Sequence, residues 1–326
     1  MKEFRNRCFG AVVLKSINSN WNADFTHHPR TLPDGTVYAT DKALKYAIKD
    51  YIRKNYPDKK VLYMKTLNKE LAPMTLEEAY ESIFGEIPKK DDASERFQVL
   101  GNLMDCLDIR LFGATFAAKG KNLSIHGPVQ INHAIDKMAA DTPGKNEIYS
   151  EQIMSPFRNP SEKKSTSQQT TLGNQTNLKE GHYVYHFSVN PLNTADYYQK
   201  LKEADESREY FLSDEDIDIL KEAMNVSVTR LDSSRKIGTE NEATIFITLK
   251  EDSRKVLPGF TDLITIEKNG DMNVLNCAKL GEVLGRAAND IEIAEMYYNP
   301  VTTKVTGLDG VDIDMKNLID FEPISV

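Results

Sequence analysis

Residues 182–190, HYVYHFSVN, show the alternation of a β-strand, with a large apolar side chain at every second position. These side chains are Tyr183, Tyr185, Phe187 and Val189. A period of two is that of a strand that buries one face. Residues 4–17, 243–249 (ATIFITL), 262–267 (DLITIE) and 292–298 (EIAEMYY) are further apolar stretches of strand length. A β-sheet is therefore predicted at the centre of the fold.

A helix is predicted to begin after Thr40, a residue type that is common at N-caps. Its apolar side chains, from Leu44 to Ile52, recur at the spacing of a helix with one buried face. Four basic side chains, three or four residues apart, form another face: Lys42, Lys45, Lys49 and Arg53. Such a row can meet successive phosphates of one nucleic-acid strand, although lysines on the polar side of a helix are often only solvated.

Further helices are predicted near residues 94–105, from Ser213 onward, and at 277–288. Residues 108–120, DIRLFGATFAAKG, are apolar enough for a buried strand, and residues 125–133, IHGPVQINH, alternate like a second one. The two are expected to be neighbours. Strands and helices in this order favour an α+β fold with a ferredoxin-like core over a doubly wound sheet.

Two long excursions interrupt this pattern. Residues 57–93 carry Pro57, Pro73 and Pro88 and are expected to hold short helical pieces. Residues 141–181 are rich in Ser, Thr, Asn, Gln and Lys, and they bury too little apolar area to form a core. A compact domain seldom carries so long a polar connection without a use for it, so we expect this one to be functional. Regular structure is predicted to resume at residue 182.

The composition sets limits on function. The 326 residues contain 49 acidic and 41 basic side chains, a net charge of −8, which disfavours a nucleic-acid partner. The acids cluster at 77–86 and 214–222, however, so a local basic groove remains compatible with the whole. The three cysteines are too few and too far apart for a disulfide framework or a four-thiolate zinc site. With no apolar run of membrane-spanning length and no signal-peptide core, a cytoplasmic location away from membranes is expected.

Motifs for familiar chemistry are absent from the sequence. It has no phosphate-binding GxxxxGK[ST] loop, no dinucleotide glycine fingerprint, no GxSxG elbow and no HExxH helix. His27 and His28 share a loop, and His182 and His186 share one face of the predicted strand, but no acidic ligands are identifiable near either pair. We therefore expect no metal and no cofactor.

Several segments together resemble one family, the backbone subunits of type I CRISPR Cascade complexes, in particular those of the I-B and I-C kind. These belong to the repeat-associated (RAMP) superfamily of RNA-binding proteins. The most specific matches are DIRLFGATF (108–116) followed by GPVQIN (127–132). The others are NSNWNADF (18–25), ATDKALKYAIKDYIR (39–53), LGNQTNLKEGHYVYHF (172–187) and SSRKIGTENEATIF (233–246).

The resemblance implies a single hand-shaped domain over residues 1–326, with an RRM-like palm, a finger insertion at about 57–93 and a thumb hairpin at about 141–181. It also implies a non-catalytic subunit that oligomerises along a CRISPR guide RNA (crRNA) and presents it for pairing with target DNA. The implied partners are the crRNA, target DNA reached through the guide, further copies of the chain and other Cascade subunits.

Site residues follow from the matched motifs. Guide-backbone contacts are implied for Thr40, Lys42, Lys45 and Lys49, with Arg53 as a weaker addition. Asn18, Asn20, Gln130, Ser234 and Arg235 lie in further matching motifs. In the thumb, Met154 and Phe157 would act as wedges against bases, and Arg158, Lys163 and Lys164 as phosphate partners.

The sequence also departs from the family pattern. The Asn-rich loop lacks the usual Pro and Gly, and Tyr46 stands where related helices often carry a basic residue. Asp24 lies in a region comparable to the one in which related type III subunits carry a catalytic loop aspartate; we interpret it as structural. Trp21 either stacks on a partner or anchors its loop to the core.

Two alternatives remain open from sequence alone. One is a RAMP-type endoribonuclease that uses a His or Asp of the loop at residues 18–30. The other is a structural adaptor that binds no nucleic acid and whose basic helix face is only solvated.

Overall fold

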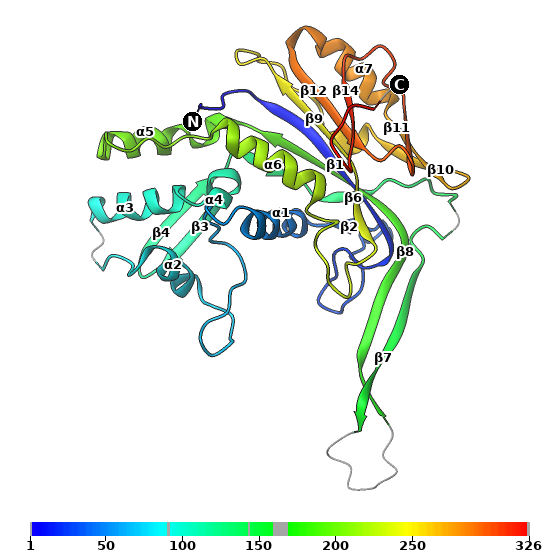
Figure 1. Ribbon diagram of the computed structural model, residues 1–326, viewed down its shortest axis with the longest axis horizontal. Helices are drawn as coiled ribbons and strands as arrows, with labels where there is room; N and C mark the ends of the chain where they lie inside the picture. Colours follow the sequence, from blue (N-terminus) through cyan, green and yellow to red (C-terminus); the bar gives the residue numbers. More distant parts are fainter. Residues whose placement is uncertain (1, 90–91, 143, 159–168, 325–326) are drawn as a thin grey trace.

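A computed structural model describes residues 2–89, 92–142, 144–158 and 169–324. The fold is of the mixed α+β type, with one large sheet at its centre (Figure 1). Among the described residues, no helix is long and apolar enough to cross a membrane.

The central sheet is built around β1 (Cys8–Ser19), which pairs antiparallel with β8 (Gln169–Val189) on one side and β9 (Thr239–Leu249) on the other. Beyond β9 lie β12 (Ile291–Tyr298) and β14 (Asp314–Asn317); beyond β8 lie β6 (Ala134–Asp136) and β2 (Tyr38–Ala39). Two more strands, β5 (Val129–Ile131) and β7 (Ile148–Arg158), also pair with β8.

The strand predicted from residues 182–190 is confirmed, but it is only the second half of β8. The same strand begins at Gln169, inside the polar segment whose composition predicted no core and for which the resemblance implied a hairpin. That half pairs with β7 in a long hairpin that projects from the body (Figure 1). A two-stranded ladder satisfies backbone hydrogen bonds without a core beneath it, which explains how so polar a sequence forms strands.

Both faces of the central sheet are covered. One face packs against α1 (Asp41–Asn55) and α6 (Asp214–Val226), and Tyr183, Tyr185 and Phe187 of β8 are buried there. The opposite face packs against α7 (Ala278–Ala287), the short η2 (Phe260–Asp262) and a sheet of β10 (Thr265–Asn269), β11 (Met272–Asn276) and β13 (Thr303–Thr306). The short η3 (Ala288–Asp290) follows α7. The strand therefore buries two faces, where the alternation predicted one.

A third cluster forms a lateral lobe beside α1 (Figure 1). It contains α2 (Leu76–Phe84), α3 (Ala93–Met104), α4 (Leu107–Phe112), β3 (Gly113–Ala118), β4 (Lys121–His126) and α5 (Ala195–Ala204), which follows η1 (Pro191–Thr194). The helices predicted near 94–105, after Ser213 and at 277–288 correspond to α3, α6 and α7.

The strand predicted at 108–120 is partly wrong, because residues 107–112 form helix α4. Short apolar runs do not distinguish a buried helix from a buried strand. Asp108 supports the helical arrangement: its carboxylate accepts backbone hydrogen bonds from Leu62 (3.0 Å) and Tyr63 (2.9 Å). Gly113, at φ 72°, ends the helix and begins β3. The two segments are neighbours only where β3 pairs with Ile125 and His126 of β4; the rest of the second segment forms β5, which pairs with β8 instead.

The centre of the sheet tolerates no side chain at Gly10. A Cβ there would collide with the backbone oxygen of Ile245 and with the ring of Phe187. We expect Gly10→Ala to lower the free energy of unfolding by about 1–3 kcal/mol, because overpacking forces the two strands apart. Urea denaturation measures this change.

Gly285→Ala is the matched control, since Gly285 lies in α7 with no neighbouring atom near a new Cβ. It should raise stability by up to about 1 kcal/mol through helix propensity. Equal effects of the two substitutions would contradict the packing argument.

Candidate nucleic-acid interface

The structure brings together the Asn-rich loop after β1 and the turn that contains Ser234 and Arg235. The Asn20 backbone N–H donates to the carbonyl oxygen of Arg235 (2.8 Å), and the Ile17 N–H donates to that of Gly238 (2.8 Å). Two segments more than 200 residues apart in the sequence therefore lie side by side. Ser234 is exposed and Arg235 is half-buried.

Trp21 anchors the loop to the core. Its side chain is fully buried, and its indole Nε1–H donates to the hydroxyl of Tyr185 on β8 (2.8 Å). That hydroxyl donates to the carbonyl oxygen of Thr40 at the start of α1 (3.1 Å). Asn22 adds a second link, because its Oδ1 accepts from the Thr40 N–H (2.8 Å) and hydroxyl (3.0 Å). Of the two roles considered for Trp21, the structure supports the anchor.

The base of the projecting hairpin joins the same place. The Asn20 amide donates to the backbone oxygen of Thr176 on β8 (3.0 Å), and the Tyr149 hydroxyl of β7 donates to Asn18 Oδ1 (3.2 Å). Asn18 is exposed in a left-handed conformation (φ 49°), whereas Asn20 is buried. We call this meeting of the loop at 18–22, the start of α1, the turn at 233–238 and the hairpin base the junction.

The basic row on α1 is exposed only in part. Lys42 and Arg53 face solvent. Lys45 pairs with Asp41 (3.1 Å), and Lys49 donates to the carbonyl oxygen of Tyr63 (2.7 Å), where burial lowers the pKa of its ammonium. Arg53 pairs with Asp50 of the same helix (3.1 Å). A phosphate would therefore have to displace a protein partner at three of these four cations.

Gln130 is not part of the junction. It is exposed on β5 opposite Ser188 of β8, and its amide donates to the carbonyl oxygen of Gly127 (2.8 Å). The junction meets β8 near Leu178, which pairs with Ser19. Ten residues of strand separate Leu178 from Ser188, a span of roughly 33 Å. Gln130 could thus contact only a different part of an extended ligand.

The hairpin exposes apolar side chains along its length. Met154 is 49% exposed and Phe157 is 77% exposed. Arg158 is the last residue of β7 and pairs with Gln169. Lys163 and Lys164 lie outside the described residues, so their predicted role stays a prediction.

Asp24 shapes its own loop. One carboxylate oxygen accepts hydrogen bonds from the Thr26 hydroxyl (2.7 Å), the Thr26 N–H (2.8 Å) and the His28 N–H (3.0 Å). The hydrogen bond from the Thr26 hydroxyl is the main cause of a lowered Asp24 pKa. A carboxylate committed to three donors of its own loop fits the structural role that we assigned to it.

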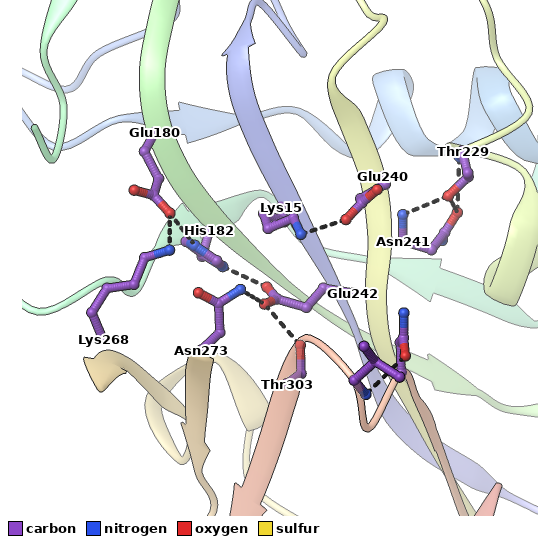
Figure 2. Close-up of polar contacts among 12 residues, drawn as sticks. Lys15, Glu180, His182, Thr229, Glu240, Asn241, Glu242, Lys268, Asn273 and Thr303 are labelled. Atoms are coloured by element: carbon purple, nitrogen blue, oxygen red, sulfur yellow. Dashed lines mark hydrogen bonds and ion pairs between the residues drawn. The ribbon is translucent and has the colours of Figure 1, made fainter. Parts of the chain in front are cut away.

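His182 lies in a buried ionic cluster on the other face of β8. Its Nδ1 is 2.5 Å from Glu242 of β9, and its Nε2 is 3.4 Å from Glu180 (Figure 2). Glu180 also pairs with Lys268 of β10 (2.7 Å), and Glu242 accepts from Asn273 of β11 (2.6 Å). The cluster thus links the central sheet to the smaller one.

These carboxylates were not identified from the sequence. The spacing of Glu180 and His182 already put them on one face, but Glu242 comes from a distant strand. Within the described ranges, no group of three His, Cys, Asp or Glu side chains is arranged to hold a metal ion.

The charge of His182 makes stability depend on pH. Burial opposes the imidazolium, but Glu242 and Glu180 outweigh burial and raise the pKa of His182 to about 9. Because the unfolded pKa is about 6.5, this contribution is complete below pH 6.5 and is lost as pH rises through 9. Hydrogen bonds from His182 and Lys268 lower the pKa of Glu180 to about 2, so its contribution is lost as pH falls from about 4.5 toward 2.

We therefore expect the urea midpoint to fall between pH 6.5 and 9.5, and to fall less steeply in His182→Gln, which has no imidazole to titrate. His186→Gln is the control, since burial lowers the pKa of His186 and leaves it neutral across this range. Parallel pH profiles for wild type and His182→Gln would show that the cluster does not couple protonation to folding.

Comparisons with known proteins cover nearly the whole chain. The family model described as "CRISPR-associated protein Cas7" matches residues 6–283. A solved structure titled "CRISPR RNA-guided surveillance complex, pre-nicking" contains a chain with the same fold: TM-score 0.52 and 12% identity, covering 96% of this chain and 97% of that one. A chain titled "CRISPR RNA-guided surveillance complex" gives TM-score 0.46 and 13% identity, covering 92% of this chain and 94% of that one.

No curated protein matches the sequence. The family model spans the loop at 18–22, α1, both strands of the hairpin and the turn at 233–238. It confirms the resemblance that the sequence motifs carried. This chain belongs to the CRISPR-associated protein Cas7 family.

Proposed function

We propose that this chain is the repeated guide-RNA-binding backbone subunit of a type I CRISPR interference complex. The junction is the observation that carries the proposal, together with membership of the Cas7 family. Three segments with motif-matched residues meet there, and the base of the hairpin that carries the proposed wedges joins them. The three are the loop with Asn18 and Asn20, the start of α1 with Thr40, and the turn with Ser234 and Arg235. Such a surface suits an extended strand better than a small molecule.

Backbone recognition reconciles an RNA partner with a net charge of −8. Watson–Crick pairing supplies the sequence specificity of a guide, so the protein needs only shape and phosphate contacts. The contacting charges can be few, because neighbouring copies on one RNA act together. Lys42 is the cation most ready for a phosphate, and Lys45 and Lys49 would exchange Asp41 and the Tyr63 carbonyl for RNA oxygens.

The shape of the molecule fits the hand-like division. The central sheet with α1 and α6 would be the RRM-like palm, residues 57–93 within the lateral lobe the fingers, and the β7–β8 hairpin the thumb (Figure 1). Met154 and Phe157 on the thumb would displace guide bases at a regular interval, since exposed apolar side chains can wedge between stacked bases. The bases between wedges would stay free to pair with target DNA.

In this proposal the chain binds and does not cut. Asp24, the position that matters for the ribonuclease alternative, commits one carboxylate oxygen to its own loop. Cleavage of target DNA would fall to a separate subunit. The adaptor alternative assumes that the lysines of α1 are only solvated. Lys45 and Lys49 are instead half-buried and have protein partners, so this observation does not favour that alternative.

Co-expression with a CRISPR array tests the proposal. We expect the purified wild type to elute as an oligomer that protects guide-length RNA. The Lys42→Ala/Lys45→Ala/Lys49→Ala triple variant should retain little RNA. Its affinity should also depend less steeply on salt, with a log–log slope shallower by about 0.7 for each phosphate that is no longer neutralised.

The matched control is Lys250→Ala/Lys279→Ala/Lys304→Ala, which removes three exposed lysines that lie outside the segments of the junction. It should keep the RNA. An RNA-free wild-type monomer, with partner subunits supplied, would support the adaptor alternative instead.

Asp24→Ala separates binding from cleavage. We expect the variant to retain guide RNA, in a smaller amount because the loop is without three of its hydrogen bonds, and neither wild type nor variant to cut a complementary RNA. The readout is a labelled target RNA on a denaturing gel with Mg²⁺ present. Cleavage by the wild type that disappears in Asp24→Ala would establish the ribonuclease alternative.

A further inference from the structure

Lys236 has an unusual environment at the junction. It follows Ser234 and Arg235 in the turn, and its Nζ lies 4.4 Å from the centre of the Trp21 ring. The same ammonium donates to the Trp21 carbonyl oxygen (2.5 Å). Within the described residues, no ion pair joins this half-buried lysine to a carboxylate.

Three other half-buried lysines of this protein do have such partners. Lys15 pairs with Glu240 (2.5 Å), while Lys221 and Lys316 both pair with Glu295 (2.5 and 2.7 Å). Burial without a counter-charge lowers the pKa of Lys236 to about 8. Lys49, which the family motif already assigns to the guide backbone, has a pKa lowered for the same main reason.

A partly desolvated cation without a carboxylate is costly, and proteins normally compensate for it. The cation–π contact with Trp21 offsets only part of that cost. Two more polar atoms nearby, Asn20 Oδ1 and Arg30 Nε, are buried without a hydrogen bond to any residue that the structure describes. Among its described residues, the junction thus holds an ammonium without a carboxylate and an amide oxygen without a donor.

We propose that Lys236 binds a phosphodiester group of single-stranded RNA, and that Trp21 holds its ammonium in place for that contact. The inference rests on the proposed function, and it adds a residue that the motif comparison did not assign. The phosphate supplies the negative charge that no carboxylate of the described residues supplies to Lys236. The indole of Trp21 holds the ammonium at the turn. Lys236 is thus a binding residue and Trp21 its positioning residue.

Three variants isolate the charge of Lys236. Lys236→Met keeps an unbranched stem over the indole but has no charge, whereas Lys236→Arg keeps the charge. Lys250→Met is the matched control, because the exposed Lys250 also donates to a backbone carbonyl, that of Asn289 (2.7 Å), far from the junction. Urea denaturation of all variants checks that the fold is retained.

The probe is a fluorescein-labelled oligouridylate, titrated by anisotropy at several KCl concentrations. We expect Lys236→Met to bind about 10-fold more weakly, with a log–log salt slope shallower by about 0.7, the share of one phosphate. Lys236→Arg should restore the slope, and Lys250→Met should match the wild type. A purely structural Lys236 would weaken binding without changing the slope.

Trp21 provides a second readout, since it is the only tryptophan of the chain. RNA binding should change the fluorescence emission of Trp21 in the wild type, because the ammonium above its ring moves from the Trp21 carbonyl to a phosphate. The change should be much smaller in Lys236→Met, which has no ammonium. An unchanged salt slope in Lys236→Met, with RNA still bound, would overturn this inference and leave the proposed function standing. Absence of RNA binding by the wild-type assembly would overturn both.

Discussion

The antiparallel pairing of β1 with β8 is the constraint on which the rest of this structure depends. It runs from Cys8 opposite Val189 to Ser19 opposite Leu178, with β8 continuing beyond β1 into the hairpin. The register decides what lies at the end of β1: the Asn-rich loop leaves the sheet beside Thr176, and Trp21 falls back onto Tyr185. Since Tyr185 also bonds the start of α1, one strand pair fixes the loop, the helix and the hairpin base relative to one another.

Patterns with a short period were predictable from sequence, and patterns that depend on distant partners were not. The apolar alternation at 183–189 and the helical spacing between Leu44 and Ile52 predicted the central strand and α1 correctly, because each pattern is complete within one short segment, although the strand buries both of its faces. The segment at 108–112 failed because an apolar run of that length fits a helix as well as a strand, and the deciding contact, Asp108 to the backbone at 62–63, lies far away in sequence.

Contacts between residues far apart in the sequence also limited the prediction of the nucleic-acid interface. Family motifs pointed to the loop, the helix and the turn, and the structure shows that these lie together, but no local pattern revealed that Lys45 and Lys49 already have protein partners. Nor did the sequence single out Lys236, whose significance depends on the absence of a carboxylate beside it within the described residues. The His182 cluster is the converse case, in which opposite charges from several strands compensate one another so well that they can be buried between two sheets.

The continuity of β8 has a mechanical consequence. A hairpin attached through a flexible linker could swing independently of the body, but here one strand of 21 residues belongs to both parts. A force applied at the far end of the hairpin is therefore carried as bending of a single strand into the middle of the sheet, where β1 resists it along eleven paired positions. The direction of the hairpin is therefore set by the path that β8 takes out of the central sheet.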